Sequence, residues 1–224
     1  MNEIYRETIT LKTRSLSDLV RVLQNVGSTH QRIVGSGQDE MRRRGYLWMI
    51  AQQKLQMDRY PNLGETVTVS TWLSDVRHGM YRRHSEICTP AGELLIQAAA
   101  VWILVDAKTR AFSMREVEVP LYQSGRELPR FSLLRPMKTE ELYDFTVPHE
   151  YIDANGHMNN AHYFDVVEPL LPENATIRTA QIDYHGEAYE QEHLPVGYTQ
   201  TDFTLLVQAR HQRGLCFRMK LEYQ

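Results

Sequence analysis

The spacing of apolar positions in the first half of the chain predicts a strand, a helix and four further strands. Alternation begins in the opening segment MNEIYRETITLKTRS, and a helical apolar face begins at Leu16, after Ser15. Turn signals rich in Gly and Pro then separate strand candidates at residues 47–57, 65–75, 80–88 and 93–105. This half is therefore predicted to be an α+β unit.

The second half repeats this order after a stretch in which the alternation fades. Residues 107–140 are rich in charges and proline, which is typical of a linker. A short alternating strand follows at 143–147, and a polar loop precedes a helical apolar face over 158–167. Three more strand candidates close the chain, the last of them with unbroken alternation over 215–223.

The repeated order predicts a duplicated α+β architecture. We expect an N-terminal domain at residues 1–115, a linker at 116–140 and a C-terminal domain at 141–224. The chain of 224 residues is long enough for each half to bury a core.

Charge, hydropathy and cysteine content argue against several classes of protein. The formal net charge is −3 and the isoelectric point is near 6.3, so general nucleic-acid binding is not expected. No apolar run approaches the length of a membrane span, and the N-terminus lacks a signal-peptide core, which favours a cytoplasmic protein. The two cysteines, Cys88 and Cys216, form neither a spaced metal motif nor a disulfide framework.

The polar loop before the second predicted helix carries the clearest candidate chemistry. It reads YIDANGHMNNAHYFDVVE over residues 151–168, with an acid, a carboxamide and an imidazole at Asp153, Asn155 and His157. Gly156 permits a sharp turn, and a helix beginning next would present unpaired N–H groups around 157–159. Such donors suit the oxygen of a thioester or ester under attack. A DxN followed by Gly is also an ordinary turn and N-cap, so both interpretations remain open.

The residues downstream favour the functional interpretation. The continuation HMNNAHY and the later Glu168 resemble the signature of hot-dog thioesterases. Together with the segments at 58–72 and 95–113, the loop at 151–165 resembles the acyl-ACP thioesterases, and this resemblance covers most of the chain. It implies two tandem hot-dog domains, each an antiparallel sheet wrapped around a long central helix. The first domain has no DxNxH loop and is expected to bind the acyl group.

The same resemblance assigns the site residues. Asn155 and His157 take the positions of the family's catalytic Asn and His, and Asp153 takes that of its loop aspartate. Glu187 matches the family's glutamate, whereas the family's adjacent cysteine is Ala188 here. The expected activity is hydrolysis of fatty acyl-ACP to a free fatty acid and holo-ACP by a carboxylate, His and Asn with water. No cysteine, cofactor or metal is expected to take part.

Two acids compete for the main chemical role. Glu187 could deprotonate a water that His157 and Asn155 help to hold, whereas Asp153 could attack the thioester directly or orient His157. We favour Glu187 as the base, with Asp153 fixing the loop and the imidazole. The experiment that separates them is substitution of each acid alone.

Other functions and the partner are also constrained. A hot-dog hydratase is disfavoured because its DxNPxH pattern has a proline where Gly156 stands and places the His one residue later. An acyl-CoA thioesterase remains the main alternative, followed by a non-catalytic protein that binds acyl thioesters. The implied partner is an acidic acyl carrier protein carrying a fatty acyl group, for which basic clusters at 42–44, 77–83 and 126–138 are candidate docking surfaces. A homodimer is left open.

Overall fold

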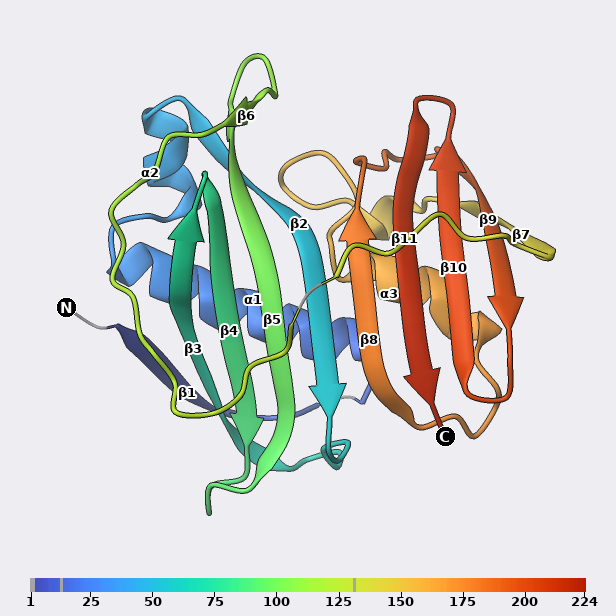
Figure 1. Cartoon of the computed structure of the whole chain (residues 1–224), viewed down its shortest axis with the longest axis horizontal. Helices are drawn as coiled ribbons and strands as arrows, with labels where there is room; N and C mark the ends of the chain where they lie inside the picture. Colours follow the sequence, from blue (N-terminus) through green and yellow to red (C-terminus); the bar gives the residue numbers. More distant parts are fainter. Residues whose placement is uncertain (1–2, 13, 131) are drawn as a thin grey trace. The chain divides into compact units, whose positions relative to one another are not determined.

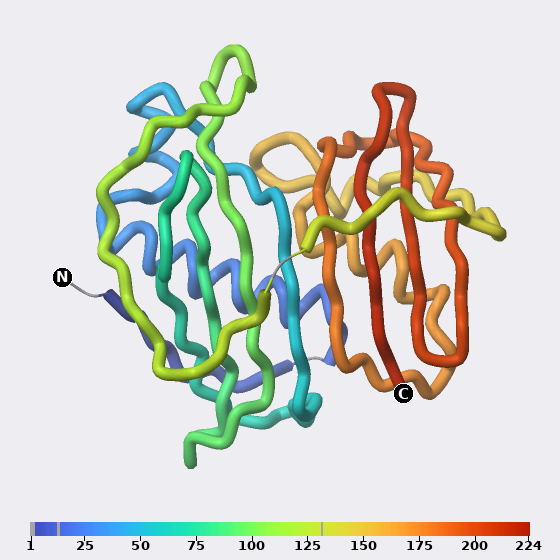
Figure 2. The backbone as a smooth tube through the Cα atoms, viewed as in Figure 1, coloured from blue at the N-terminus to red at the C-terminus, as the bar shows by residue number. Residues whose placement is uncertain are grey.

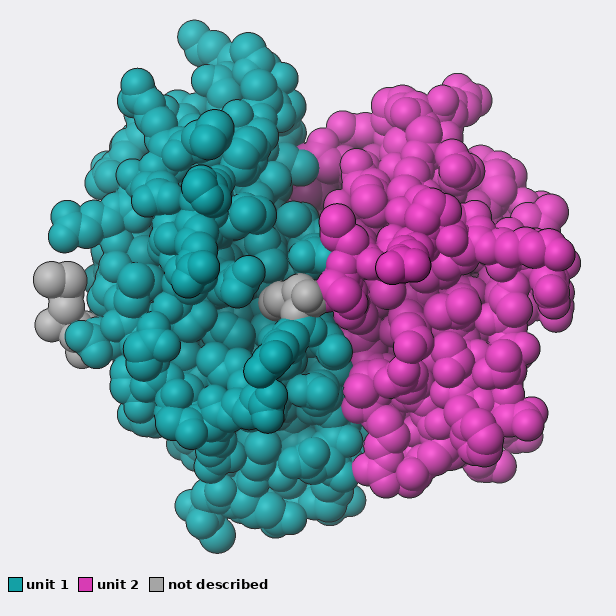
Figure 3. Space-filling view, in the orientation of Figure 1, with its two compact units in different colours: residues 1–14, 18–130 teal, residues 15–17, 131–224 magenta. Residues whose placement is uncertain are grey.

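The computed structural model describes residues 3–12, 14–130 and 132–224, which fall into two compact units (Figure 3). The first unit comprises residues 1–14 and 18–130, and the second comprises 15–17 and 131–224. Much of the segment proposed as a linker, up to residue 130, therefore belongs to the first unit.

The first unit is an antiparallel sheet with one long helix across a face (Figure 1). The strands lie in the order β1-β3-β4-β5-β2, and the short β6 pairs with β5. Their bounds are β1 Ile4–Thr10, β2 Tyr46–Met57, β3 Thr66–Arg77, β4 Met80–Cys88, β5 Leu94–Asp106 and β6 Phe112–Ser113. Helix α1 spans Leu16–Ile33, and a second helix that the sequence pattern did not predict, α2, spans Gln38–Arg43.

Burial follows the predicted periodicity in the first unit. The apolar face of α1 is buried, with Leu19 and Val20 at 1% and 0% exposure. Along β4 burial alternates from Met80 to Arg83, so that Arg83 is buried whereas its neighbour Arg82 is exposed, and the next two residues, His84 and Ser85, are buried as well. A charged side chain therefore lies inside this unit, bonded to His30 and Thr71, which is unusual.

The second unit repeats the strand order of the first. Its sheet runs β7-β9-β10-β11-β8, so in both units the first strand of the unit lies beside the third and the second lies beside the fifth. The strands are β7 Glu141–Thr146, β8 Ile177–Tyr184, β9 His193–Gln200, β10 Thr204–His211 and β11 Gly214–Tyr223. Four strands follow the helix in this unit, whereas the sequence pattern indicated three.

The helix of the second unit is much shorter than expected. Helix α3 spans only His162–Val167 and continues as a 3₁₀ turn, η2, over Glu168–Leu170. Pro169 cannot donate within a helix, which explains the change at this end. At the other end, Met158 is paired with Ile152 in an isolated β-bridge, so its apolar side chain reaches the core from a loop.

Residues 114–130 and 132–140, which follow β6 and precede β7, contain no helix or strand; Figure 2 shows their path. Their first part runs along the first unit, where Tyr122 N donates to Leu73 O at 2.8 Å. Their last part runs along the second unit, where Leu134 N donates to the buried carboxylate of Asp183 at 2.6 Å. These contacts hold the segment although it lacks alternating apolar residues. No helix in the described ranges is long and apolar enough to cross a membrane.

Candidate active site

The candidate loop is a tight hairpin closed by its own main chain. Asp153 N donates to His157 O at 3.0 Å, and Gly156 N donates to Asp153 O at 2.9 Å. Gly156 has φ = +81°, a conformation that residues with a Cβ rarely adopt. The glycine therefore allows the chain to reverse between Asp153 and His157.

The carboxylate of Asp153 makes its hydrogen bonds inside this loop. It accepts from Asn155 N at 2.7 Å and from the side-chain amides of Asn155 and Asn159 at 3.4 and 3.3 Å. Asn155 itself is exposed. These contacts make Asp153 a fixed acceptor for the turn rather than a partner of the His157 ring.

A second loop brings Glu187 to the imidazole. It follows β8, and it is joined to the first loop because Met158 N donates to Ala188 O at 2.8 Å. Glu187 Oε1 then lies 3.4 Å from His157 Nε2, and the two side chains are only 17% and 16% exposed. The other carboxylate oxygen, Oε2, accepts from the hydroxyl of Tyr189 at 3.0 Å. Two of the predicted residues, His157 and Glu187, thus face each other directly.

Each ring nitrogen of His157 faces an oxygen atom. His157 Nδ1 lies 3.3 Å from Met158 O, and a carbonyl can only accept, so Nδ1 carries a proton. Nε2 faces the Glu187 carboxylate, which is also an acceptor when ionised. The imidazole is thus held between the main chain of Met158 and the Glu187 carboxylate.

Tyr163 holds the second loop in place. Its hydroxyl donates to Gly186 O at 3.3 Å and accepts from Ala188 N at 3.2 Å, so it bonds the main chain on both sides of Glu187. The side chain is 2% exposed, and burial raises its pKa well above the usual range. The tyrosine of the HMNNAHY motif thus positions the loop of the candidate base.

Two further residues around Glu187 carry no signal in the sequence. Tyr189 bonds the carboxylate, and the guanidinium of Arg213 lies 4.7 Å from the centre of the Tyr189 ring. Arg213 also donates to Glu187 O at 2.8 Å. Arg213 stands between β10 and β11, far along the chain, so only the fold brings it to the site.

The prediction that helix N–H groups around 157–159 would polarise a carbonyl is wrong for two of the three. Met158 N donates to Ala188 O, and Asn159 N donates to Tyr151 O at 2.8 Å. Helix α3 begins only at His162, and His162 N donates to Asn159 O at 2.9 Å. The amides of Met158 and Asn159 therefore hold the loops together and cannot serve as free donors.

Neither cysteine is placed to act as a nucleophile. Ala188, which stands where the family has a cysteine, is fully buried and contributes to the site only the hydrogen bonds of its main-chain N–H and carbonyl. Cys216 is buried behind the second loop, with Sγ 3.5 Å from Gly186 O, and burial raises the pKa of its thiol to about 12. Cys88 belongs to the first unit, and burial raises its pKa as well. Both cysteines are free thiols and neither is a thiolate near neutral pH.

Known proteins match the chain along most of its length. The acyl-ACP thioesterase N-terminal domain family matches residues 4–120, and the C-terminal domain family matches residues 134–222. The chloroplastic acyl-(acyl-carrier-protein) hydrolase FATB2 of Cuphea viscosissima is 29% identical over 181 residues, which are 72% of this chain and 44% of that protein. The chain therefore spans less than half the length of this curated relative.

Solved structures show the same fold. An acyl-ACP thioesterase from Bacteroides thetaiotaomicron superposes with a TM-score of 0.92 at 19% identity, covering 100% of this chain and 98% of that one. The 12:0-ACP thioesterase from Umbellularia californica gives 0.81 at 19% identity, covering 100% and 98%. With both domain families matched in order along the sequence, the chain belongs to the acyl-ACP thioesterase family.

Proposed function

We propose that the chain hydrolyses fatty acyl-ACP to a free fatty acid and holo-ACP at the site formed by Asp153, Asn155, His157 and Glu187. The observation that carries the proposal is the contact between Glu187 and His157, 3.4 Å apart on two loops that the main chain joins. Family membership supports a thioester substrate. In this scheme the first unit binds the acyl chain and the second carries out the chemistry.

Glu187 acts as the general base in this mechanism. Its carboxylate takes a proton from a water, and the water oxygen attacks the thioester carbon. The imidazole of His157 and the Asn155 amide stabilise the oxyanion that forms. Collapse of the intermediate breaks the C–S bond, and the departing sulfur receives a proton from His157 or from the protonated Glu187. The products are one carboxylic acid and one free thiol, which balances the addition of one water.

The alternative, direct attack by Asp153, fits the geometry less well. Three N–H groups from Asn155 and Asn159 already occupy the Asp153 carboxylate. A nucleophile would have to give up these bonds and loosen the turn on which His157 stands. Asp153 is therefore assigned to hold the loop.

Separate substitution of the two acids tests this assignment. Glu187→Gln should lower kcat on acyl-ACP by about 10²- to 10⁴-fold, the range expected for loss of a general base. Asp153→Asn should lower kcat less and should also lower stability. Glu190→Gln provides the control, because Glu190 is an exposed acid close to Glu187 in sequence. Near-normal rates for both Glu187→Gln and Asp153→Asn would show that the site lies elsewhere.

Charge reversal in the basic segment 126–138 tests whether the acyl carrier protein docks there. Arg135 and Lys138 are exposed members of the basic segment 126–138, and an acidic carrier protein would be attracted to them. The double variant Arg135→Glu with Lys138→Glu should raise KM for acyl-ACP severalfold and leave acyl-CoA hydrolysis unchanged, measured on matched acyl chains. Equal effects on both substrates would contradict docking here, and faster turnover of acyl-CoA by the unmodified protein would identify CoA as the natural carrier.

A further inference from the structure

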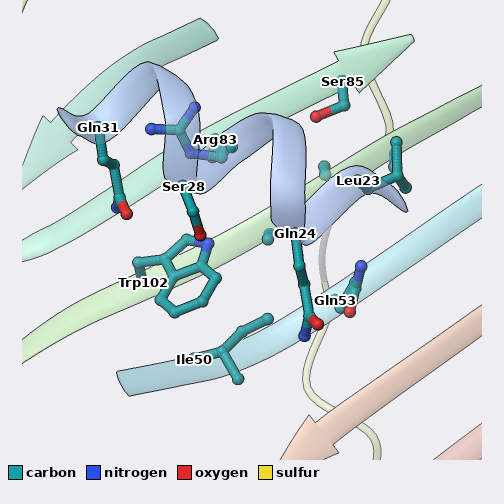
Figure 4. A pocket seen from close by; sticks show the side chains of 13 residues that line it. Leu23, Gln24, Ser28, Gln31, Ile50, Gln53, Arg83, Ser85 and Trp102 are labelled. Atoms are coloured by element: carbon teal, nitrogen blue, oxygen red, sulfur yellow. The ribbon is translucent and has the colours of Figure 1, made fainter. Parts of the chain in front are cut away.

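Both units contain buried polar side-chain atoms without a hydrogen-bond partner among the described residues. In the first unit, Arg83 Nη2 is such an atom, and the arginine lines a pocket between helix α1 and the sheet (Figure 4). That pocket belongs to the unit to which the proposed function assigns the acyl chain. In the second unit, both ring nitrogens of His211 are such atoms. His211 is the last residue of β10, and the proposed mechanism does not use it.

Hydrogen bonding does not explain the histidine at position 211. A neutral imidazole has one donor and one acceptor, and a buried polar atom that stays unpaired costs free energy. In His211 both nitrogens are in this state among the described residues. The ring therefore serves through the space that it fills.

The Nε2–Cε1 edge of the His211 ring packs against Gly186, the residue that precedes the candidate base. A Cβ at Gly186 would lie 2.6 Å from His211 Nε2 and 3.2 Å from Cε1. It would also lie 3.3 Å from Leu215 O. Non-bonded heavy atoms prefer separations of about 3.5–4.0 Å, so position 186 has no room for a side chain while the ring is in place.

The backbone conformation does not by itself require glycine at position 186. Gly156 in the first loop has φ = +81°, whereas Gly186 is not among the glycines with positive φ. An alanine could adopt this backbone without strain. The close approach of His211 is therefore the feature that excludes a side chain here.

Hydrogen bonds hold the main chain of Gly186 on its other sides. Its N–H donates to a main-chain carbonyl of β11 at 3.0 Å, and its carbonyl accepts from the Tyr163 hydroxyl at 3.3 Å. Glu187 is the next residue, so a displacement of Gly186 moves Glu187 as well. The Glu187 carboxylate lies 3.4 Å from His157 Nε2, and that contact depends on where the loop stands.

We propose that His211 is a positioning residue for Glu187, because its ring, packed against Gly186, fixes where the second loop presents the carboxylate to His157. This inference rests on the proposed function, in which Glu187 is the general base. A methyl group at position 186 would have to move by about 1 Å to reach an ordinary distance from the ring. Misplacing a catalytic group by about 1 Å lowers the rate by up to about 100-fold.

A double-mutant cycle tests the proposal in the full chain. Gly186→Ala should lower kcat on acyl-ACP by about 10- to 100-fold and leave KM within about twofold, because only the base is displaced. His211→Ala should lower kcat less, since the loop keeps its hydrogen bonds. In the double variant the new methyl group finds the space of the missing ring, so kcat should be at least about fivefold higher than in Gly186→Ala. Independent structural damage would instead make the two losses add.

The imidazole of His157 provides a readout that needs no substrate. Its Cε1–H NMR signal, identified by its loss in His157→Gln, should shift in Gly186→Ala and return towards its original position in the double variant. Should the unmodified protein not hydrolyse acyl-ACP, the proposed function fails, and this signal still decides whether His211 positions Glu187. An unchanged signal in Gly186→Ala, or no recovery in the double variant, would overturn the proposal.

Two matched variants control for the substitutions themselves. Gly125→Ala makes the same change at a glycine whose Cβ would meet nothing within 4 Å, and Gln212→Ala truncates the exposed residue next to His211. Both should leave kcat and the His157 signal unchanged. If Gly186→Ala fails to fold, circular dichroism of the double variant measures the same recovery: a folded double variant supports the contact, and an unfolded one overturns it.

Discussion

Replacing Tyr163 with phenylalanine removes one oxygen from the centre of the candidate active site. The hydroxyl bonds Gly186 O and Ala188 N, and these two groups flank the proposed base, Glu187. The ring would stay, with its edge-to-face contacts to Tyr184 and Phe217 at 5.2 and 5.4 Å between centroids. The change therefore isolates the link between the helix and the loop.

The magnitude follows from the two lost bonds. Each hydrogen bond contributes about 1 kcal/mol net, and Tyr163 and Ala188 are buried, so Tyr163→Phe should lower the free energy of unfolding by about 2 kcal/mol. The loop would keep its bond from Met158 N to Ala188 O, so Glu187 would shift rather than leave. Because small displacements of a catalytic group are costly, kcat should fall about tenfold with KM nearly unchanged.

Denaturant unfolding and steady-state hydrolysis of acyl-ACP measure the two effects. The control is Tyr184→Phe, which removes a single part-buried bond to Asn160 O at 3.0 Å and no bond to residues 186–188. It should cost about 1 kcal/mol and leave kcat within about twofold. If Tyr163→Phe leaves both stability and kcat unchanged, or if Tyr184→Phe lowers kcat equally, Tyr163 does not position the base.

Two further predictions concern the cysteines and the first unit. Cys216→Ala should keep kcat within about twofold and lower stability by about 1 kcal/mol, because the thiol is buried packing and not a nucleophile; a large loss of kcat at normal stability would contradict this. In the first unit, Arg59 and an N–H from Asn62 lower the pKa of Glu65 from 4.5 to about 2. Because its pKa is lower in the folded state, the Glu65 carboxylate stabilises the fold fully above pH 4.5 and progressively less as the pH falls through 2. Glu65→Gln should therefore cost up to about 1 kcal/mol at pH 7, reduced by the partial exposure of the Arg59 ion pair, and almost nothing below the folded-state pKa of about 2, measured by unfolding across pH.

Periodicity in the sequence predicted the regular parts of the fold well. The pattern at 80–88 coincides with β4, Met80–Cys88, and the helix predicted to begin at Leu16 does so. Alternation predicts strands because each side of the sheet is either buried or exposed along its length. The recurrence of strand, helix and strands is visible in the order shared by the two sheets.

Elements with weak periodicity escaped prediction. Helix α2, Gln38–Arg43, has six residues of which only Met41 is buried, too few for a pattern to emerge. The apolar run at 158–167 predicted a full helix, yet the main chain of Met158 pairs with the second loop instead. Tertiary hydrogen bonding, which the local apolar pattern cannot predict, therefore kept Met158 out of the helix.

Only part of the candidate site could be predicted from the sequence. Asp153, Asn155 and His157 lie close in the sequence, so turn chemistry alone suggested their proximity. Glu187 was indicated only by resemblance, because nothing in the intervening residues encodes a 3.4 Å approach. The hydrogen bonds of Tyr189 and Arg213 to Glu187 form only once the second unit is folded, and no sequence pattern indicated them.

The main-chain role of Ala188 has a consequence for how the protein withstands oxidation. Position 188 serves the site through its N–H and its carbonyl, so a small side chain without sulfur meets every requirement there. Peroxide and alkylating reagents act on accessible thiolates, and neither loop of the site contains a thiol. We therefore expect the proposed activity to persist in aerated solution without a reductant.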